Sequence, residues 1–274
     1  MEEIHAELSQ IDLDAITKGF PDLPAMRGML SADLQYAPSN SSFMVVADAH
    51  IDSLFYEGGR VGELMFNTVY LPLSDKEHQV DMHLFRDRNE VAAINAYYKM
   101  GQTDYLDGNM NITDLPLEMV NPFIPDNMAK LTGALQGELA ISGTASAPDV
   151  NGYVRMDSSA VYVTAVGSSF RFDKQDIRIK DNLIRFDKYN IYASGTNPFI
   201  IDGTVDIHNP SRMMANLKLT AQNMQLLNVK RNKESMVYGK LLVNLNSTIK
   251  GPLDALVMRG DLQLLGGTNV TYVM

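Results

Sequence analysis

The sequence predicts an all-β protein, an elongated and curved body of sheet-forming modules with only a few short helical turns. Apolar and polar residues alternate over most of the 274 residues, which is typical of strands with one wet face. No segment carries an apolar stripe of helical period longer than about two turns. A cassette of turn and strand signals also recurs at a spacing of roughly a hundred residues, so each repeat holds several strands.

The recurring cassette is clearest at 117–152, where a short helical turn at Leu117–Asn121 and a Pro125-Asp126 break lead into a strand. Gly143 and Pro148 then precede the next strand, which is expected to begin at Gly152. Residues 13–28 repeat the first part, and Ile249 to Gly260 repeat the last part with the same spacing of glycines. We therefore predict two modules, at 1–112 and 113–222, and a partial third at 223–274, all in one continuous domain.

Composition narrows the class of protein. An apolar content of 45% and a charged content of 20% exclude wholesale disorder, and no apolar run is long enough for a membrane-spanning helix. The net charge of −10 makes nucleic acid an improbable partner and disfavours simple docking on an anionic membrane. With no cysteine, the chain cannot form a disulfide, a thiolate metal site or a cysteine nucleophile.

The beginning of the chain, MEEIHAELSQ, has neither the basic nor the apolar region of a secretory signal. We expect either a cytoplasmic protein or a piece of a longer exported chain. The second is favoured, because Thr271–Met274 falls in the middle of a strand pattern.

The first half reads as an edge strand, a helical turn and a series of hairpins. Residues 2–13 alternate weakly and lead into a helical turn at Asp14–Lys18. Turn clusters then separate successive strands. Asp107-Gly108 is predicted as a tight turn before a strand at Asn109–Thr113. The strands between are expected at Met29–Tyr36, Phe43–Phe55, Arg60–Tyr70, Gln79–Arg86 and Ala92–Met100.

The second half alternates most regularly, with arginine and aspartate side chains between apolar ones. A helical turn is expected at Met224–Val229, then a basic loop at Lys230–Lys233 and strands carrying Leu241, Val243 and Leu245. The apolar positions predicted to share one face are Val154, Met156, Val161, Val163, Phe170, Phe172, Ile177, Ile179, Ile184, Phe186, Phe199, Ile201, Val205, Ile207, Leu217 and Leu219.

Such a face needs a partner layer, a closed barrel or a ligand to cover it. From alternation alone, an ordinary closed core is favoured over an open groove. A metal site is not expected, although Asp81 and His83 fall on one face of a strand near His78, because the other histidines are scattered. Asp104, Asp107 and Asn109 lack the rest of a calcium loop.

No nucleophile elbow, phosphate-binding loop or paired-carboxylate constellation occurs, so we expect no catalytic residues and no cofactor. The clearest basic cluster, at 230–233, is better explained as a solvated loop than as a contact for lipid headgroups.

A longer ordered pattern resembles a known family. It consists of KLTGALQGELAISGT at 130–144, APDVNG at 147–152 and IRIKDNLIRF at 177–186. Together with the helical turn and Pro-Asp break before it, this pattern is similar to the C-terminal domain of the TamB (translocation and assembly module) family, in the wider AsmA-like group. The resemblance is strongest over about 115–207.

The resemblance implies a non-enzymatic periplasmic segment of a Gram-negative envelope protein, anchored in the inner membrane when full length and reaching a TamA-like outer-membrane barrel. Members form a β-taco, an open trough of sheet with an apolar concave wall. The residues of the shared apolar face would then line a groove for phospholipid acyl chains or for an unfolded β-strand of a client protein. With the resemblance added, an open or ligand-filled groove is favoured.

Three other functions stay open at this point. One is a chaperone or scaffold for assembly of outer-membrane barrels or autotransporters, which would use exposed sheet edges. Another is a carbohydrate-active β-helix enzyme, which would need a carboxylate cluster that cannot be assembled here. The third is a structural spacer or adhesin module with a closed core.

Overall fold

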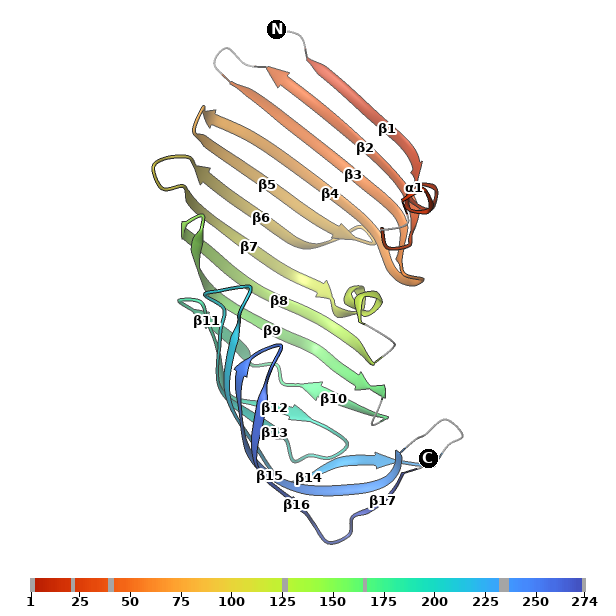
Figure 1. Ribbon diagram of the computed structural model, residues 1–274. Helices are drawn as coiled ribbons and strands as arrows, with labels where there is room; N and C mark the ends of the chain where they lie inside the picture. Colours follow the sequence, from red (N-terminus) through yellow and green to blue (C-terminus); the bar gives the residue numbers. More distant parts are fainter. Residues whose placement is uncertain are drawn as a thin grey trace. The chain divides into compact units, whose positions relative to one another are not determined.

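The computed structural model describes residues 3–20, 23–38, 42–124, 128–164, 167–231 and 237–272. These residues form a 17-stranded antiparallel sheet and two short helices (Figure 1), which confirms the predicted all-β class. The elements up to the first long hairpin are β1 (Ile4–Asp12), α1 (Leu13–Gly19), β2 (Met26–Pro38), β3 (Phe43–Tyr56), β4 (Gly59–Ser74), β5 (Glu77–Arg86), β6 (Asn89–Lys99), β7 (Tyr105–Pro116), η1 (Leu117–Phe123), β8 (Ala129–Thr144) and β9 (Ala147–Val163). They are followed by β10 (Ser168–Phe172), β11 (Asp176–Lys180), β12 (Leu183–Tyr192), β13 (Phe199–Asp206), β14 (Met214–Val229), β15 (Val237–Pro252), β16 (Val257–Leu264) and β17 (Asn269–Tyr272).

Internal contacts divide the chain into two compact units. The N-terminal unit comprises Met1–Phe123 and Gln136–Val150, and the C-terminal unit comprises Ile124–Leu135 and Asn151–Met274. Strands β8 and β9 therefore contribute one part to each unit. The three modules predicted at 1–112, 113–222 and 223–274 rest on repeated sequence rather than on packing, and they stay a prediction.

In the N-terminal unit, β1 to β7 form a meander in which each strand pairs antiparallel with the next. Each strand predicted in this region is found, with both ends within four residues of the expected ones. Between β3 and β4, one of the turn clusters expected between strands is found at Glu57-Gly58, and both residues have positive φ. Tight turns with positive φ suit the right-handed twist of the strands they join.

The predicted turn at Asp107-Gly108 is wrong. Both residues lie inside β7, where Gly108 is opposite Ala96 of β6. A Cβ atom at Gly108 would come within 2.8 Å of the carbonyl oxygen of Asn95. The glycine therefore permits a close approach of two backbones, and a glycine after aspartate was misinterpreted as a turn.

Two short helices lie at the same end of the strands of the N-terminal unit, as predicted at 14–18 and 117–121. Asp12 caps α1 by accepting a hydrogen bond of 2.9 Å from the Asp14 amide. The buried side chain of Leu117 anchors η1, and Phe123 packs its ring 4.3 Å from that of Tyr56 in β3. The Pro125-Asp126 break of the cassette falls outside the described residues.

Both cassettes place a glycine beside a distorted point of the neighbouring strand. Gly28 and Gly133 have φ of 146° and 92°, and Ser53 and Ser158 of the adjacent strands have positive φ. A Cβ at Gly133 would lie 2.5 Å from the Cα of Ser159. The repeated glycine therefore accommodates a bulge, a feature that increases the local twist of a sheet.

In the C-terminal unit, β9 pairs with both β10 and β11, and these two strands pair with β12. Strands β12 to β15 continue in order. Strand β15 then pairs along most of its length with β16 and near its beginning with β17.

The helical turn predicted at Met224–Val229 is wrong, because these residues form the end of β14. The register of β14 against β15 shifts between Ala221 and Met224 and again between Gln225 and Leu227. Each shift moves the apolar positions out of strict alternation, which made the pattern look helical. Pairing with the long β15 gives the backbone the hydrogen bonds of a strand instead.

The boundary predicted around Gly143 and Pro148 is also corrected. Strand β8 continues to Thr144 and β9 begins at Ala147, so Gly143 and Pro148 lie inside strands rather than between them. Glycine and proline usually mark turns, but these long strands contain both. Gly143 adopts a φ of 110° within β8, next to the hairpin.

Candidate functional site

The predicted apolar face of the C-terminal unit is present as a face of the sheet. Residues directly opposite each other in an antiparallel ladder point to the same side, so the register assigns the faces. Ile179 is opposite Ile184, which is opposite Val205 in the next strand. Ile201 and Phe199 are in turn opposite Leu219 and Ala221. Except for Ile207, which follows β13, the residues predicted to line the groove lie in strands on this one side.

The other side of the same strands is polar, as predicted. Arg178 is opposite Arg185, and Arg155 is opposite Asp176 with a distance of 2.7 Å between Nη2 and Oδ1. This side is wet, and its ion pairs are exposed. The two sides of the sheet therefore differ in chemistry over the whole unit, which is what alternation requires.

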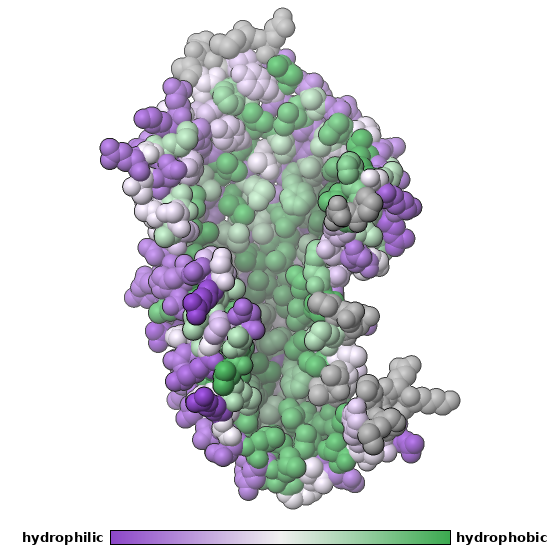
Figure 2. Space-filling view, in the orientation of Figure 1, coloured by the Kyte–Doolittle hydropathy of each residue, from purple (hydrophilic) through white to green (hydrophobic). Residues whose placement is uncertain are grey.

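The residues of the apolar face are half-buried for the most part. Ile177, Ile179, Val205 and Leu219 are buried, and the other predicted lining residues are intermediate. Among the described strands of this unit, extensive contacts run between neighbours in the sheet, with β10 against β14 as the exception. A second layer would bury these side chains fully. In Figure 2, apolar side chains gather inside a hollow and polar ones lie on its outer rims.

A small closed core occupies one end of this face. Met224 is 1% exposed and packs with Ala193, Ala221 and Val243. Phe170 and Phe199, both on the predicted face, pack against this cluster with Leu226, Leu241 and Leu245. The aromatic residues of the prediction are thus partly core residues. The face combines a packed end with an open remainder.

The N-terminal unit has a second apolar face, which was not predicted as a site. Its rows are read from the register in the same way, and alternation alone could have found them. Alanine, glycine, threonine and tyrosine dilute the pattern there, so it is less conspicuous than the isoleucine and phenylalanine of the other unit. The residues on this face include Leu30, Ala32, Leu34, Tyr36, Val45, Ala47, Ala49, Ile51, Leu64, Phe66, Thr68, Tyr70, Val80, Met82, Leu84, Ala92, Ile94, Ala96, Gly108, Met110 and Ile112.

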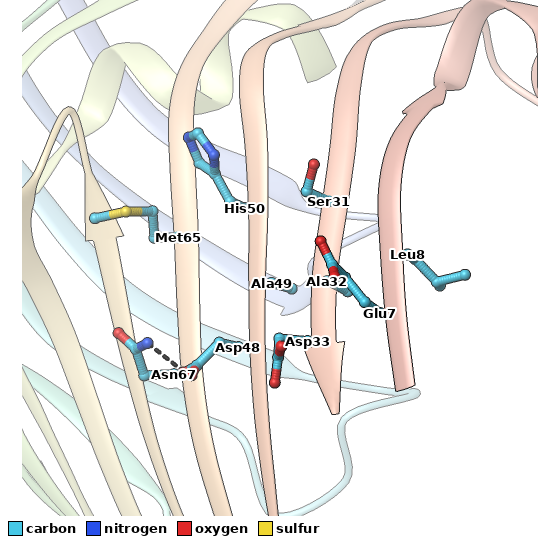
Figure 3. A pocket seen from close by; sticks show the side chains of 10 residues that line it. All are labelled: Glu7, Leu8, Ser31, Ala32, Asp33, Asp48, Ala49, His50, Met65 and Asn67. Atoms are coloured by element: carbon cyan, nitrogen blue, oxygen red, sulfur yellow. Dashed lines mark hydrogen bonds between the residues drawn. The ribbon is translucent and has the colours of Figure 1, made fainter. Parts of the chain in front are cut away.

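The opposite face of the N-terminal unit carries carboxylates and histidines. A hollow of about 250 Å³ lies over β1 to β4 on this face (Figure 3), lined by Glu7, Leu8, Ser31, Ala32, Asp33, Asp48, Ala49, His50, Met65 and Asn67. The hydrogen bond from His5 lowers the pKa of Asp33, and Asp33 raises the pKa of His5 by the same bond. His50 pairs with Glu63 at 3.0 Å.

Comparison with protein families decides the relationship. The model of the TamB N-terminal domain matches residues 1–156, which is more than half of the chain. The chain belongs to the TamB family. The family is the one that the sequence pattern resembles. The matched domain, however, is the N-terminal one rather than the C-terminal one, and the match begins upstream of the segment 115–207. Searches of curated proteins and of solved structures give no match.

Membership of TamB places the chain among envelope proteins of Gram-negative bacteria. The helices among the described residues are too short to cross a bilayer. The motif segments of the resemblance fall on β8, on the beginning of β9 and on β11 to β12.

The metal ligands considered from the sequence are not brought together in the part of the chain that the structure describes. His78 lies on the apolar face, where its Nδ1 is 2.7 Å from the hydroxyl of Tyr70. Asp81 and His83 lie on the opposite face, where His83 pairs with Glu90 at 3.4 Å. Asp104 accepts hydrogen bonds from the Gly101 amide and the Tyr98 hydroxyl. The described residues contain no group of three or more potential ligands.

Proposed function

We propose that this TamB-family chain is a periplasmic segment that carries phospholipid acyl chains between the inner and outer membranes on the apolar faces of its sheet. The observation that supports the proposal most is the half-burial of those faces. Side chains such as Ile201 and Leu217 are half-buried, on a face where the contacts among the described strands run mainly between neighbours in the sheet.

The free energy at stake is large. Burial of hydrocarbon stabilises by about 0.8 kcal/mol per CH₂, so an acyl chain of about 16 carbons costs roughly 12 kcal/mol in water. A face that removes even half of this surface from water lowers the barrier by several kcal/mol. The polar rims would leave the headgroup hydrated, which suits an amphipathic cargo.

Strand β13 offers a matched pair of variants for the test. Ile201 points to the apolar face and Ile200, its neighbour, points to the opposite face beside Thr220 and Asn190. Both side chains are half-buried. Ile201→Asp and Ile200→Asp therefore make the same chemical change at adjacent residues on opposite sides of the sheet.

Native mass spectrometry of the gently extracted chain measures the phospholipid that copurifies. We expect Ile201→Asp to lower the bound fraction at least about tenfold, because a carboxylate would be desolvated against an acyl chain. Ile200→Asp should keep its lipid, and circular dichroism should show both variants folded. Loss of lipid from both variants, or from neither, would refute the proposal.

A second candidate function is supported by β16, for which the residue pairings described in the structure are with β15 alone. All eight residues of this strand are exposed, with Leu262 and Leu264 each 61% exposed. An exposed edge can pair with an incoming strand, so β16 could hold an unfolded strand of an outer-membrane barrel or autotransporter. A photocrosslinker at Gln263 should then capture such clients, and Ile201→Asp should not change the yield. No client captured at β16 would remove this candidate.

Either function would end at the outer membrane, and we propose a TamA-like barrel protein as the partner there. Nucleic acid is not proposed as a partner, since the net charge of −10 opposes phosphate binding.

A further inference from the structure

Five rings from neighbouring strands form a row at one end of the apolar face of the N-terminal unit. Strands β2 to β6 each contribute one ring, and consecutive ring centroids lie 5.2, 6.0, 5.9 and 6.3 Å apart. The aromatic row, as we call this set, consists of Tyr36, Phe43, Tyr70, His78 and Tyr98.

The row is amphipathic. All five side chains are half-buried, and several carry polar atoms at their tips. The hydroxyl of Tyr70 lies 2.7 Å from Nδ1 of His78, and the hydroxyl of Tyr98 donates to Oδ2 of Asp104 at 2.8 Å. When the Tyr70 hydroxyl donates to Nδ1, the other ring nitrogen of His78 carries the proton. His78 can then donate a hydrogen bond from Nε2.

Farther along the strands, the same face is apolar except for the hydroxyl of Thr68. The rows next to the aromatic row are aliphatic or small, and Phe66 adds one more ring. We call these residues the aliphatic floor: Leu34, Ala47, Thr68, Met82, Ile94 and Met110, followed by Ala32, Ala49, Phe66, Leu84, Ala92 and Ile112. In these described rows no side chain is charged. Polarity therefore changes along the strand direction, from the aromatic row to the floor.

We propose that the aromatic row binds the glycerol ester and phosphate region of a phospholipid whose acyl chains lie on the aliphatic floor. The inference rests on the proposed function and deepens it, because it assigns the lipid a direction on the sheet. Tyrosine rings favour the boundary between hydrocarbon and water, where the ring meets chains and the polar tip meets esters. His78 is the one basic side chain in these rows, and an Nε2–H group there would donate a hydrogen bond to an ester or phosphate oxygen of the lipid.

A carbohydrate is the other ligand that stacks on rows of aromatic rings. Sugar hydroxyls need hydrogen-bonding side chains on both sides of the row. The adjoining row instead offers Leu34, Ala47, Met82 and Ile94, with Thr68 as its one hydroxyl. The chemistry of the floor therefore favours the lipid.

Tryptophan probes test the direction, because the chain contains no tryptophan of its own. Tyr70→Trp places a probe in the aromatic row, and Phe66→Trp places one on the floor of the same strand, about 14 Å away at about 3.4 Å per residue. Phe85→Trp, on the opposite face, is the matched control. Tyr98→Trp serves as a second probe of the row should Tyr70→Trp fail to fold.

Each variant is loaded with phosphatidylcholine that carries a spin label on the choline or near the methyl end of one acyl chain. We expect the choline label to quench the row probe at least about threefold more than the chain-end label does, with the order reversed for the floor probe. The control on the opposite face should be quenched by neither label.

Other results separate this inference from the proposed function. Equal quenching of the row and floor probes by both labels would overturn the fixed direction while leaving lipid binding intact. Quenching at neither probe would overturn the direction and the lipid function together. A response of the row probe to maltoheptaose, without quenching by labelled lipid, would replace the lipid with a carbohydrate. Quenching of all three probes would reveal adsorption without a site and would also overturn the inference.

Discussion

Truncation of Met224 tests whether the apolar face of the C-terminal unit has one closed end and an open remainder. Met224 is 1% exposed and lies among Ala193, Ala221 and Val243. Met224→Ala removes three heavy atoms beyond Cβ and leaves a cavity that its small neighbours cannot fill. Leu217, on the same strand and the same face, is only half-buried and makes the matched comparison.

The expected costs follow from the two environments. Substitutions of a fully buried methionine by alanine cost about 2–5 kcal/mol, because the transfer of apolar atoms and the residual cavity both contribute. We expect about 3 kcal/mol for Met224→Ala. For Leu217→Ala we expect about 1 kcal/mol, since part of the side chain already contacts water and no closed cavity forms.

Urea denaturation followed by circular dichroism measures both costs from the shift of the midpoint at constant slope. The reasoning would be refuted by a Leu217→Ala variant as destabilised as Met224→Ala. Leu217 would then be enclosed, the face would be a closed core, and the groove would lose its physical basis. A cost below about 1 kcal/mol for Met224→Ala would show that the cluster itself is not packed.

Two further predictions concern the backbone and pH. Gly133→Ala should cost about 2 kcal/mol or more, because its φ is 92° and a Cβ would lie 2.5 Å from the Cα of Ser159. Gly58→Ala, with a φ of 80° and open space, should cost less in the same thermal melt; equal costs would mean that the contact with Ser159 is relieved. The hydrogen bond between His5 and Asp33 raises the pKa of His5 above 6.5 and lowers the pKa of Asp33 below 3.8. The pair therefore stabilises the folded state fully between these two pH values. This stabilisation is lost as the pH rises through the pKa of His5 in the folded state, or falls through the pKa of Asp33 in the folded state. Hydrogen exchange of β1, corrected for its intrinsic rate, should therefore speed up by at most about a few-fold between about pH 5 and about pH 8, and an unchanged response in Asp33→Asn would contradict this cause.

An apolar face of the sheet was predicted where alternation is strong and was missed where alternation is weak. Residues such as Ile177, Ile179 and Ile184 alternate with arginines, and their shared face follows from local sequence alone. In the N-terminal unit, Ala47, Ala49 and Gly108 occupy the same kind of position without the contrast in hydropathy. A small side chain on an apolar face does not differ enough from one in a turn, and Asp107-Gly108 was misjudged for that reason.

The errors in secondary structure have a related cause. Met224 to Val229 departs from strict alternation because the register shifts twice against β15. A bulge is a relation between two strands that are distant in sequence, so a pattern within one strand cannot reveal it. Within one strand, the extra residue of a bulge looks like a change in the period of the apolar residues.

The amino-acid sequence by itself determined the all-β class, the two helical turns, the polar and apolar sides of the best alternating strands and the TamB relationship. These properties depend on local period and on an ordered pattern of residues. Only the tertiary structure decided which rows lie side by side, which side chains stay half-exposed, and that Tyr36 and Tyr98 belong to one aromatic row. The physical reason is that register arises from the sum of many cross-strand contacts between distant segments, and a shift of one residue would send every side chain to the other face.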